Sequence, residues 1–133
     1  MARRARFPSS PSSIRFRPWI RQQVQRTARR SRRPFSEVVQ DLLEEALRMR
    51  QCPGIYFADE PAGREAKVAG TGLSVWEVIR DYLAEGRDET KLREALPHLT
   101  PAQIKGALLY YRGWPQEIGE LIADNAEAAA GQA

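Results

Sequence analysis

The stretch that decides the fold runs from residue 13 to residue 50 and reads SIRFRPWIRQQVQRTARRSRRPFSEVVQDLLEEALRMR. Its first five residues, Ser13-Ile14-Arg15-Phe16-Arg17, alternate polar and apolar side chains, which is the pattern of a strand with one dry face. A strand this short needs a partner strand to be stable. Pro18 ends the alternation and suits the first turn of a helix.

Two amphipathic helices are predicted after this strand. In the first, apolar or small residues recur along one stripe at Ile20, Val24, Thr27 and Ala28. Ser36 is a good N-cap for the second helix. Its apolar stripe is Val38, Val39, Leu42, Leu43, Ala46 and Leu47. The segment therefore predicts strand, helix, turn and helix, which cannot bury a sizeable core alone and favours an intertwined dimer.

Charge is distributed unevenly along the 133 residues. Residues 1–50 hold 13 Arg and 4 acidic residues, a net charge of +9, whereas residues 51–133 hold 8 Lys and Arg and 13 acidic residues, a net charge of −5. Residues 1–33 contain 11 Arg and no acid. This asymmetry indicates one end that binds a polyanion and another end with a different task.

Composition also limits the cellular setting. No run approaches eighteen consecutive apolar residues, so no membrane span is expected. The Arg- and Ser-rich start is typical of a transit peptide, but Pro8, Pro11 and Pro18 break the helix that such a peptide needs. The single cysteine, Cys52, fits a reducing compartment. We therefore expect a cytoplasmic protein.

The second half predicts a short β-hairpin followed by helices. Strands are expected at 55–57 and 65–68, and helices at 74–85, from Asp88, at 100–112 and after Trp114-Pro115. Ser74 with Glu77 and Thr100 with Gln103 have the spacing of capping boxes. The predicted organisation is a disordered basic arm (1–12), a first domain (13–51), a second domain (52–123) and a flexible tail (124–133).

Residues 13–50 resemble the ribbon-helix-helix repressors, whose two strands pair in a dimer and enter the major groove. The resemblance implies base contacts from Ser13, Arg15 and Arg17. It implies phosphate contacts from the arm and from the turn and start of the second helix, namely Arg3, Arg4, Arg6, Arg32, Arg33, Phe35 and Ser36. It further implies a dimer core of Ile14, Phe16, Ile20, Val24, Val38, Val39, Leu42 and Leu43.

The turn departs from that family, whose members usually carry a glycine there. This chain has Ser31-Arg32-Arg33-Pro34 instead. A non-glycine residue must then adopt a left-handed conformation, or the first helix must end differently. The alternative interpretation is a plain two-helix hairpin with a basic surface.

Residues 52–122 resemble the antitoxin-like domains found beside PIN-like nucleases in bacterial toxin–antitoxin systems (VapB-type antitoxins). The resemblance rests on Val68-Ala69-Gly70-Thr71-Gly72-Leu73-Ser74-Val75, Ala84-Glu85-Gly86, Leu96-Pro97-His98-Leu99-Thr100, Ile104 and Ala107 to Tyr110. The family's turn is commonly Gly-Thr-Arg, and Gly72 replaces that arginine here. The fold class expected for the whole chain is mainly α: a ribbon-helix-helix dimer followed by a small helix-turn-helix-like domain with a short β-hairpin.

Catalysis is not indicated by any constellation in the sequence. The lone His98 is expected to pack, Cys52 has no partner at metal-ligand spacing, and Gly70-Thr71-Gly72 lacks the lysine of a phosphate-binding loop. We expect no enzyme activity, cofactor or metal. The function predicted is an antitoxin that binds operator DNA as a homodimer and neutralises a PIN-like ribonuclease. The alternatives are a free-standing repressor without a toxin partner and, from another class, an enzyme or nuclease subunit.

Overall fold

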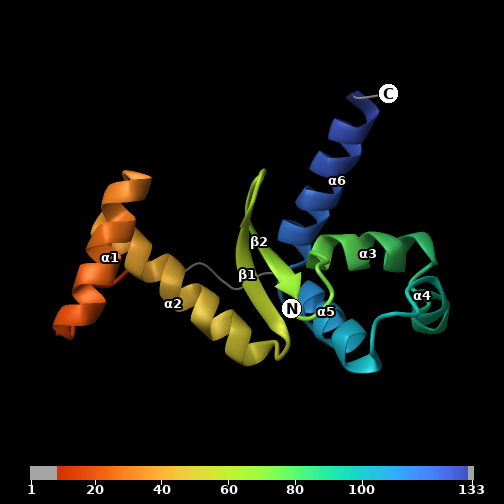
Figure 1. Ribbon diagram of the computed structural model, residues 1–133, viewed down its shortest axis with the longest axis horizontal. Helices are drawn as coiled ribbons and strands as arrows, with labels where there is room; N and C mark the ends of the chain where they lie inside the picture. The colour runs from red at the N-terminus through yellow and green to blue at the C-terminus, as the bar shows by residue number, and fades with distance from the viewer. Residues whose placement is uncertain (1–8, 132–133) are drawn as a thin grey trace. The chain divides into compact units, whose positions relative to one another are not determined.

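The computed structural model describes residues 9–131, which divide into two compact units, 9–48 and 49–131. The described part is mostly helical, with one two-stranded sheet in the middle of the chain (Figure 1). None of the helices within 9–131 is long and apolar enough to cross a membrane. In chain order the elements are α1 (Pro18–Ser31), α2 (Phe35–Gln51), β1 (Ile55–Glu60), β2 (Gly63–Val68), α3 (Val75–Ala84), α4 (Glu89–Ala95), α5 (Pro101–Gly113) and α6 (Pro115–Gly131).

The predicted N-terminal ribbon-helix-helix fold is wrong, because residues 9–17 form neither strand nor helix. The two strands within residues 9–131 lie in the hairpin that follows α2. An alternating pattern becomes a strand only where a second strand supplies its hydrogen bonds. Phe16 instead places its ring edge-on against Phe35 of α2, with ring centroids 5.6 Å apart. One of the two apolar residues of the alternation thus makes a side-chain contact within the chain, while the other, Ile14, is exposed.

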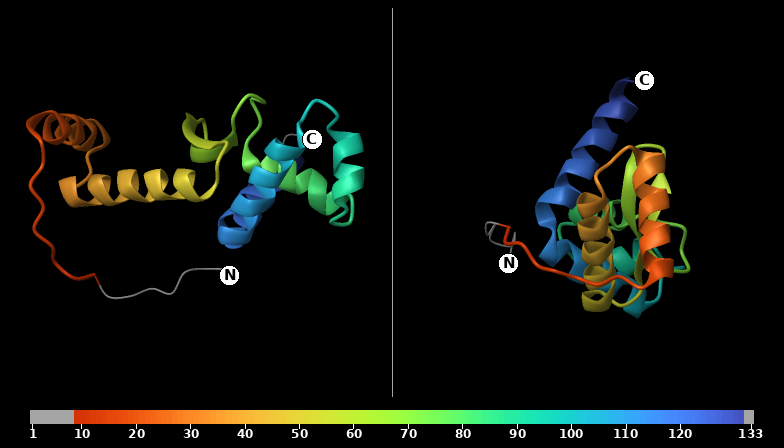
Figure 2. Two further views of the ribbon diagram at one scale, coloured as in Figure 1. Left: turned by 90° about the horizontal axis from the view of Figure 1, so that it is seen from below. Right: turned by 90° about the vertical axis from the view of Figure 1, so that its left-hand side faces the viewer.

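The first unit is a pair of helices joined by a tight turn. Pro18 occupies the first turn of α1, as predicted, and Arg32 ends the helix in the left-handed conformation with φ 54°. The N–H of Arg33 donates to the carbonyl of Ala28 at 3.0 Å, which closes the helix end. Of the two possibilities left open by the missing glycine, the chain takes the left-handed one. Figure 2 shows α1 over the N-terminal half of α2.

The second helix starts earlier than its sequence suggested. It runs from Phe35, so Ser36 lies in its first turn and not at the N-cap. Pro34 precedes the helix, and its carbonyl accepts the N–H of Val38 at 3.2 Å, which is the first hydrogen bond of α2.

The hairpin of the second unit is present and longer than predicted. β1 and β2 pair antiparallel with Ile55 opposite Val68 and Glu60 opposite Gly63. Residues 65–68 of β2 are all buried. An isolated bridge between Lys67 and Ser74 ties the end of the hairpin to the start of α3.

The helices of the second unit begin where the capping residues predict. The boxes of Ser74 with Glu77 and Thr100 with Gln103 are both present, and Asp88 accepts the N–H of Lys91. These caps satisfy N–H groups that have no partner inside the helix. α6 is helical through residues 124–131, which the sequence suggested as a tail.

The core of this unit lies between the hairpin and helices α3 to α6. Tyr110 of α5 is fully buried near its centre, with ring centroids 4.9 Å from Trp114 and 6.1 Å from Phe57. The Tyr110 hydroxyl donates to Glu117 of α6 at 2.5 Å. The other large side chains that are fully buried are Cys52, Val68, Val75, Val78, Ile79, Leu92, Ile104 and Ile118.

Candidate nucleic-acid interface

One face of α1 carries exposed arginines that no carboxylate of the described residues neutralises. Val24 is the buried residue of this helix, and at 3.6 residues per turn Arg26, Arg29 and Arg30 fall on the opposite side. All three are exposed, and α1 contains no acidic residue. Within residues 9–131 their side chains make no ion pair or hydrogen bond. Their donors are therefore free to bind an external anion.

Other arginines of the unit are engaged within the chain. The guanidinium of Arg21 lies over the rings of Phe16 and Phe35, at 5.6 and 5.9 Å from their centroids. Arg33 pairs with Asp41 and, at 3.3 Å, with Glu37. The hydrogen bond to Asp41 raises the pKa of Arg33. Arg33, a predicted phosphate contact, is thus partly neutralised, whereas Arg32 has no such partner among residues 9–131.

The residues predicted to read bases precede α1. Ser13, Arg15 and Arg17 are exposed in a segment without secondary structure, so no ribbon presents them. Their role at bases stays a prediction that has lost its structural basis. Ser36 is exposed in the first turn of α2, while Phe35 is half-buried. Arg3, Arg4 and Arg6, assigned to phosphates, lie outside the described residues.

The residues predicted to form the dimer core differ in their burial within a single chain. Val24 and Val38 are buried, and Phe16, Ile20 and Val39 are half-buried. In contrast, Ile14, Leu42 and Leu43 are 57%, 45% and 52% exposed. Leu47 and Trp19 add further exposed apolar surface, at 56% and 70%.

Sequence reasoning placed no site residue on the outer face of α1. Trp19, Arg26, Arg29 and Arg30 were all missed. The signal for them was available, because the residues opposite the apolar stripe of an amphipathic helix face solvent.

Buried polar groups of the second unit serve its own structure. Glu65 is buried and accepts from the Ser74 hydroxyl at 2.7 Å and from the Trp76 indole at 3.1 Å. Lys67 donates to Glu60 at 2.5 Å. His98 is exposed, contrary to the expectation that it packs. No three His, Cys, Asp or Glu side chains within 9–131 are grouped so that they could hold a metal ion.

Part of the second unit is similar to a known protein family. A family model described as a protein of unknown function (DUF433) matches residues 58–111, which run from within β1 to near the end of α5. Neither the curated proteins nor the solved structures include a match to this chain. The first unit lies entirely outside the matched range.

Proposed function

We propose that this chain is a cytoplasmic antitoxin that binds operator DNA as a homodimer and neutralises a PIN-like ribonuclease. The observation that carries the DNA-binding part is the exposed, unpaired set of Arg26, Arg29 and Arg30 on α1. Arginine donates paired hydrogen bonds to phosphate oxygens, and a helix without acids does not repel the backbone of DNA. The net charge of +9 over residues 1–50 draws the polyanion to this end.

Dimerisation is supported by the apolar residues that the first unit leaves uncovered. Leu43 and Leu47 are four residues apart on α2, so they share one helix face, and both are more than half exposed. Among residues 9–48, only Val24 and Val38 are buried. A second copy would bury this face through α2 without a paired β-ribbon. It would also double the number of arginines available to one duplex.

Toxin neutralisation is assigned to the second unit on different grounds. The net charge of −5 over residues 51–133 suits a partner with a basic RNA-binding cleft. The resemblance of residues 52–122 to antitoxin-like domains names the class of that partner. A free-standing repressor is the second candidate, because the arginines of α1 favour DNA binding whether or not a toxin exists.

DNA binding is tested by fluorescence anisotropy with a duplex from the region upstream of the chain's own gene. The affinity should fall steeply with salt, and the double variant R26Q/R30Q should lower the salt slope by about 0.9 for each lost phosphate contact. The matched control is K91Q/R93Q, which removes two exposed cations from α4. An unchanged slope in R26Q/R30Q would refute the placement of DNA on α1.

The same assay tests the predicted base contacts. Replacing Arg15 or Arg17 by Ala shows whether either residue reads a base, in which case discrimination between operator and random duplex falls by about 1–3 kcal/mol per site. Equal losses on both duplexes would show that these residues contact phosphates only.

Toxin binding is tested by co-expressing the chain with the product of the adjacent gene. Co-purification together with suppressed ribonuclease activity supports the antitoxin. If the neighbouring product is no nuclease and does not bind, the free-standing repressor is the better description.

A further inference from the structure

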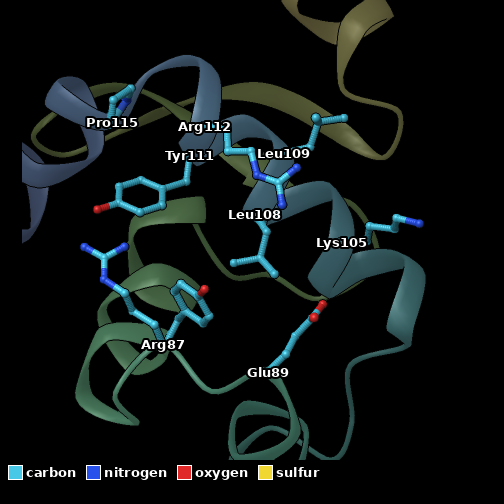
Figure 3. Close-up of a pocket in the computed structure, with 9 residues that line it drawn as sticks. Arg87, Glu89, Lys105, Leu108, Leu109, Tyr111, Arg112 and Pro115 are labelled. Carbon is cyan, nitrogen blue, oxygen red and sulfur yellow. The ribbon is translucent and has the colours of Figure 1, made fainter. Parts of the chain in front are cut away.

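A pocket of about 540 Å³ lies in the second unit, between the end of α3, the start of α4 and one side of α5 (Figure 3). Its volume falls within the range of about 300–1,000 Å³ that is usual for small-molecule sites. Most of its lining residues fall inside the range matched by the family model. DNA binding by α1 does not use it.

The pocket concentrates positive charge in an otherwise acidic unit. Arg87, Lys105 and Arg112 line it, with Glu89 as the carboxylate among its lining residues. Figure 3 shows Arg87 and Arg112 approaching the hollow from opposite sides, while Lys105 points outward at its edge. Within residues 9–131 none of these three cations makes a side-chain ion pair or hydrogen bond. Two guanidinium groups without a partner among residues 9–131 thus line one hollow, and such groups favour a bound anion.

The backbone at Arg87 supports a role for its side chain. Arg87 has φ 62°, in the left-handed region that non-glycine residues rarely adopt. Its N–H donates to the carbonyl of Tyr82 at 2.9 Å, which holds this conformation at the end of α3. Strained residues of this kind cluster at ligand sites. A glycine here would be easier to accommodate but would remove one of the cations that line the pocket.

Aromatic and aliphatic side chains complete the lining. Tyr111 lies beside Arg87 and Arg112 in Figure 3, with Leu108 inside the hollow, and Tyr82 also contributes. Flat rings next to arginines can stack on a planar ligand group. A lone carboxylate from a partner protein would satisfy the arginines but leave these rings and most of the volume unused.

We propose that this pocket binds a free mononucleotide, that is, a phosphate monoester attached to a planar base. Arg87 and Arg112 hold the phosphate, Tyr111 stacks on the base, and Glu89 accepts from a base amine or a sugar hydroxyl. A longer strand is disfavoured, because the surrounding unit has a net charge of −5. The proposal does not rest on the antitoxin function.

The test is calorimetric titration of the full chain with the four ribonucleoside 5′-monophosphates at physiological salt. At least one should bind one to one with a Kd below about 1 mM, and its nucleoside and inorganic phosphate should each bind at least about tenfold more weakly. R87Q and R112Q should each weaken nucleotide binding by at least about tenfold, because each loses a charge-assisted pair. Circular dichroism should show that both variants remain folded.

Matched controls separate this pocket from other basic surfaces. R93Q, on the neighbouring helix α4, and R26Q/R30Q, in the first unit, should leave nucleotide affinity unchanged. The proposal fails if no mononucleotide binds, if R87Q and R112Q bind as well as the original chain, or if R26Q/R30Q abolishes binding. It also fails if phosphate alone binds as tightly as the nucleotide, or if a 5′-phosphorylated tetranucleotide or an acidic peptide binds at this pocket more tightly.

Discussion

Phe16 meets Phe35 edge to face, with ring centroids 5.6 Å apart and ring planes at 89°. Arg21 lies over both rings, so one residue before α1, one on α1 and one on α2 form a single cluster. This cluster holds the residues at the start of α1 against the start of α2. It replaces the paired strands that the alternation of residues 13–17 suggested.

Replacing Phe16 by Ala should loosen α1 without disturbing the second unit. Loss of an aromatic pair costs about 0.5–1.5 kcal/mol beyond the lost apolar area. Amide exchange in α1 should therefore accelerate by several-fold, while α3 and α5 keep their protection. Phe16→Leu is the control that retains most of the apolar area. Equal protection of α1 in the Ala variant and the original chain would show that the cluster does not stabilise this unit.

The exposed leucines of α2 should control the oligomeric state. L43E/L47E places two like charges on the face proposed to meet a second copy, and each lost leucine removes about 1.5–3 kcal/mol of burial. Sedimentation should then report a monomer where the original chain is a dimer. L109E, at an exposed leucine of α5, is the control and should remain dimeric. A monomeric original chain at micromolar concentration would contradict the proposed dimer.

Glycine at position 32 should stabilise the first unit and weaken DNA binding. Arg32 occupies the left-handed region, which costs a non-glycine residue about 1–2 kcal/mol, so Arg32→Gly relieves strain while it removes a charge. Arg30→Gly removes the same charge from the helix interior and should destabilise by about 1 kcal/mol. Opposite changes in thermal stability, with similar losses of DNA affinity, are expected. A loss of stability in both variants would show that the left-handed conformation of Arg32 does not strain the turn.

Two glycines in helices should respond oppositely to alanine. A Cβ at Gly106 of α5 would lie 3.1 Å from the carbonyl oxygen of Pro53, whereas a Cβ at Gly119 of α6 would meet nothing within 4 Å. Gly119→Ala should stabilise by about 0.5–1 kcal/mol through helix propensity. Gly106→Ala should lower the urea midpoint, because backbone must move to admit the methyl group. Stabilisation by both variants would mean that Pro53 shifts freely.

Stability of the second unit should decline in strong alkali. The hydrogen bond to Glu60 raises the pKa of Lys67 above its ordinary value of 10.5. Because the folded state holds this proton more tightly, the stabilisation is complete below pH 10.5 and is lost as the pH rises through the folded-state pKa. The difference between the urea midpoints of the original chain and the Lys67→Met variant should shrink as the pH rises from neutral to strongly alkaline. Parallel pH profiles would contradict a contribution from this pair.

The elements of the second unit could be predicted because they depend on residues close together in the sequence. The fold predicted for the first unit was wrong because it depended on a partner strand. The capping boxes at Ser74 and Thr100 and the hairpin are formed by residues that are close in the sequence, so the sequence could predict them. The strand at residues 13–17 required a partner strand, which a five-residue alternation cannot guarantee. The pocket was missed because Arg87 and Arg112 come to line the same hollow only after α3 and α5 have packed. The one local indication was the spacing of Lys105 and Arg112, which lie seven residues apart and therefore on one face of α5.

The 70% exposure of Trp19 has a spectroscopic consequence. Trp19 is the one tryptophan of residues 9–48, while Trp76 and Trp114 are half-buried in the second unit. Its indole should emit at long wavelength and be quenched readily by acrylamide, unlike the other two. Dimer formation or a duplex lying along α1 would shield it and shift its emission to the blue. The chain thus contains an intrinsic optical probe of its basic surface, and no label is needed to follow events there.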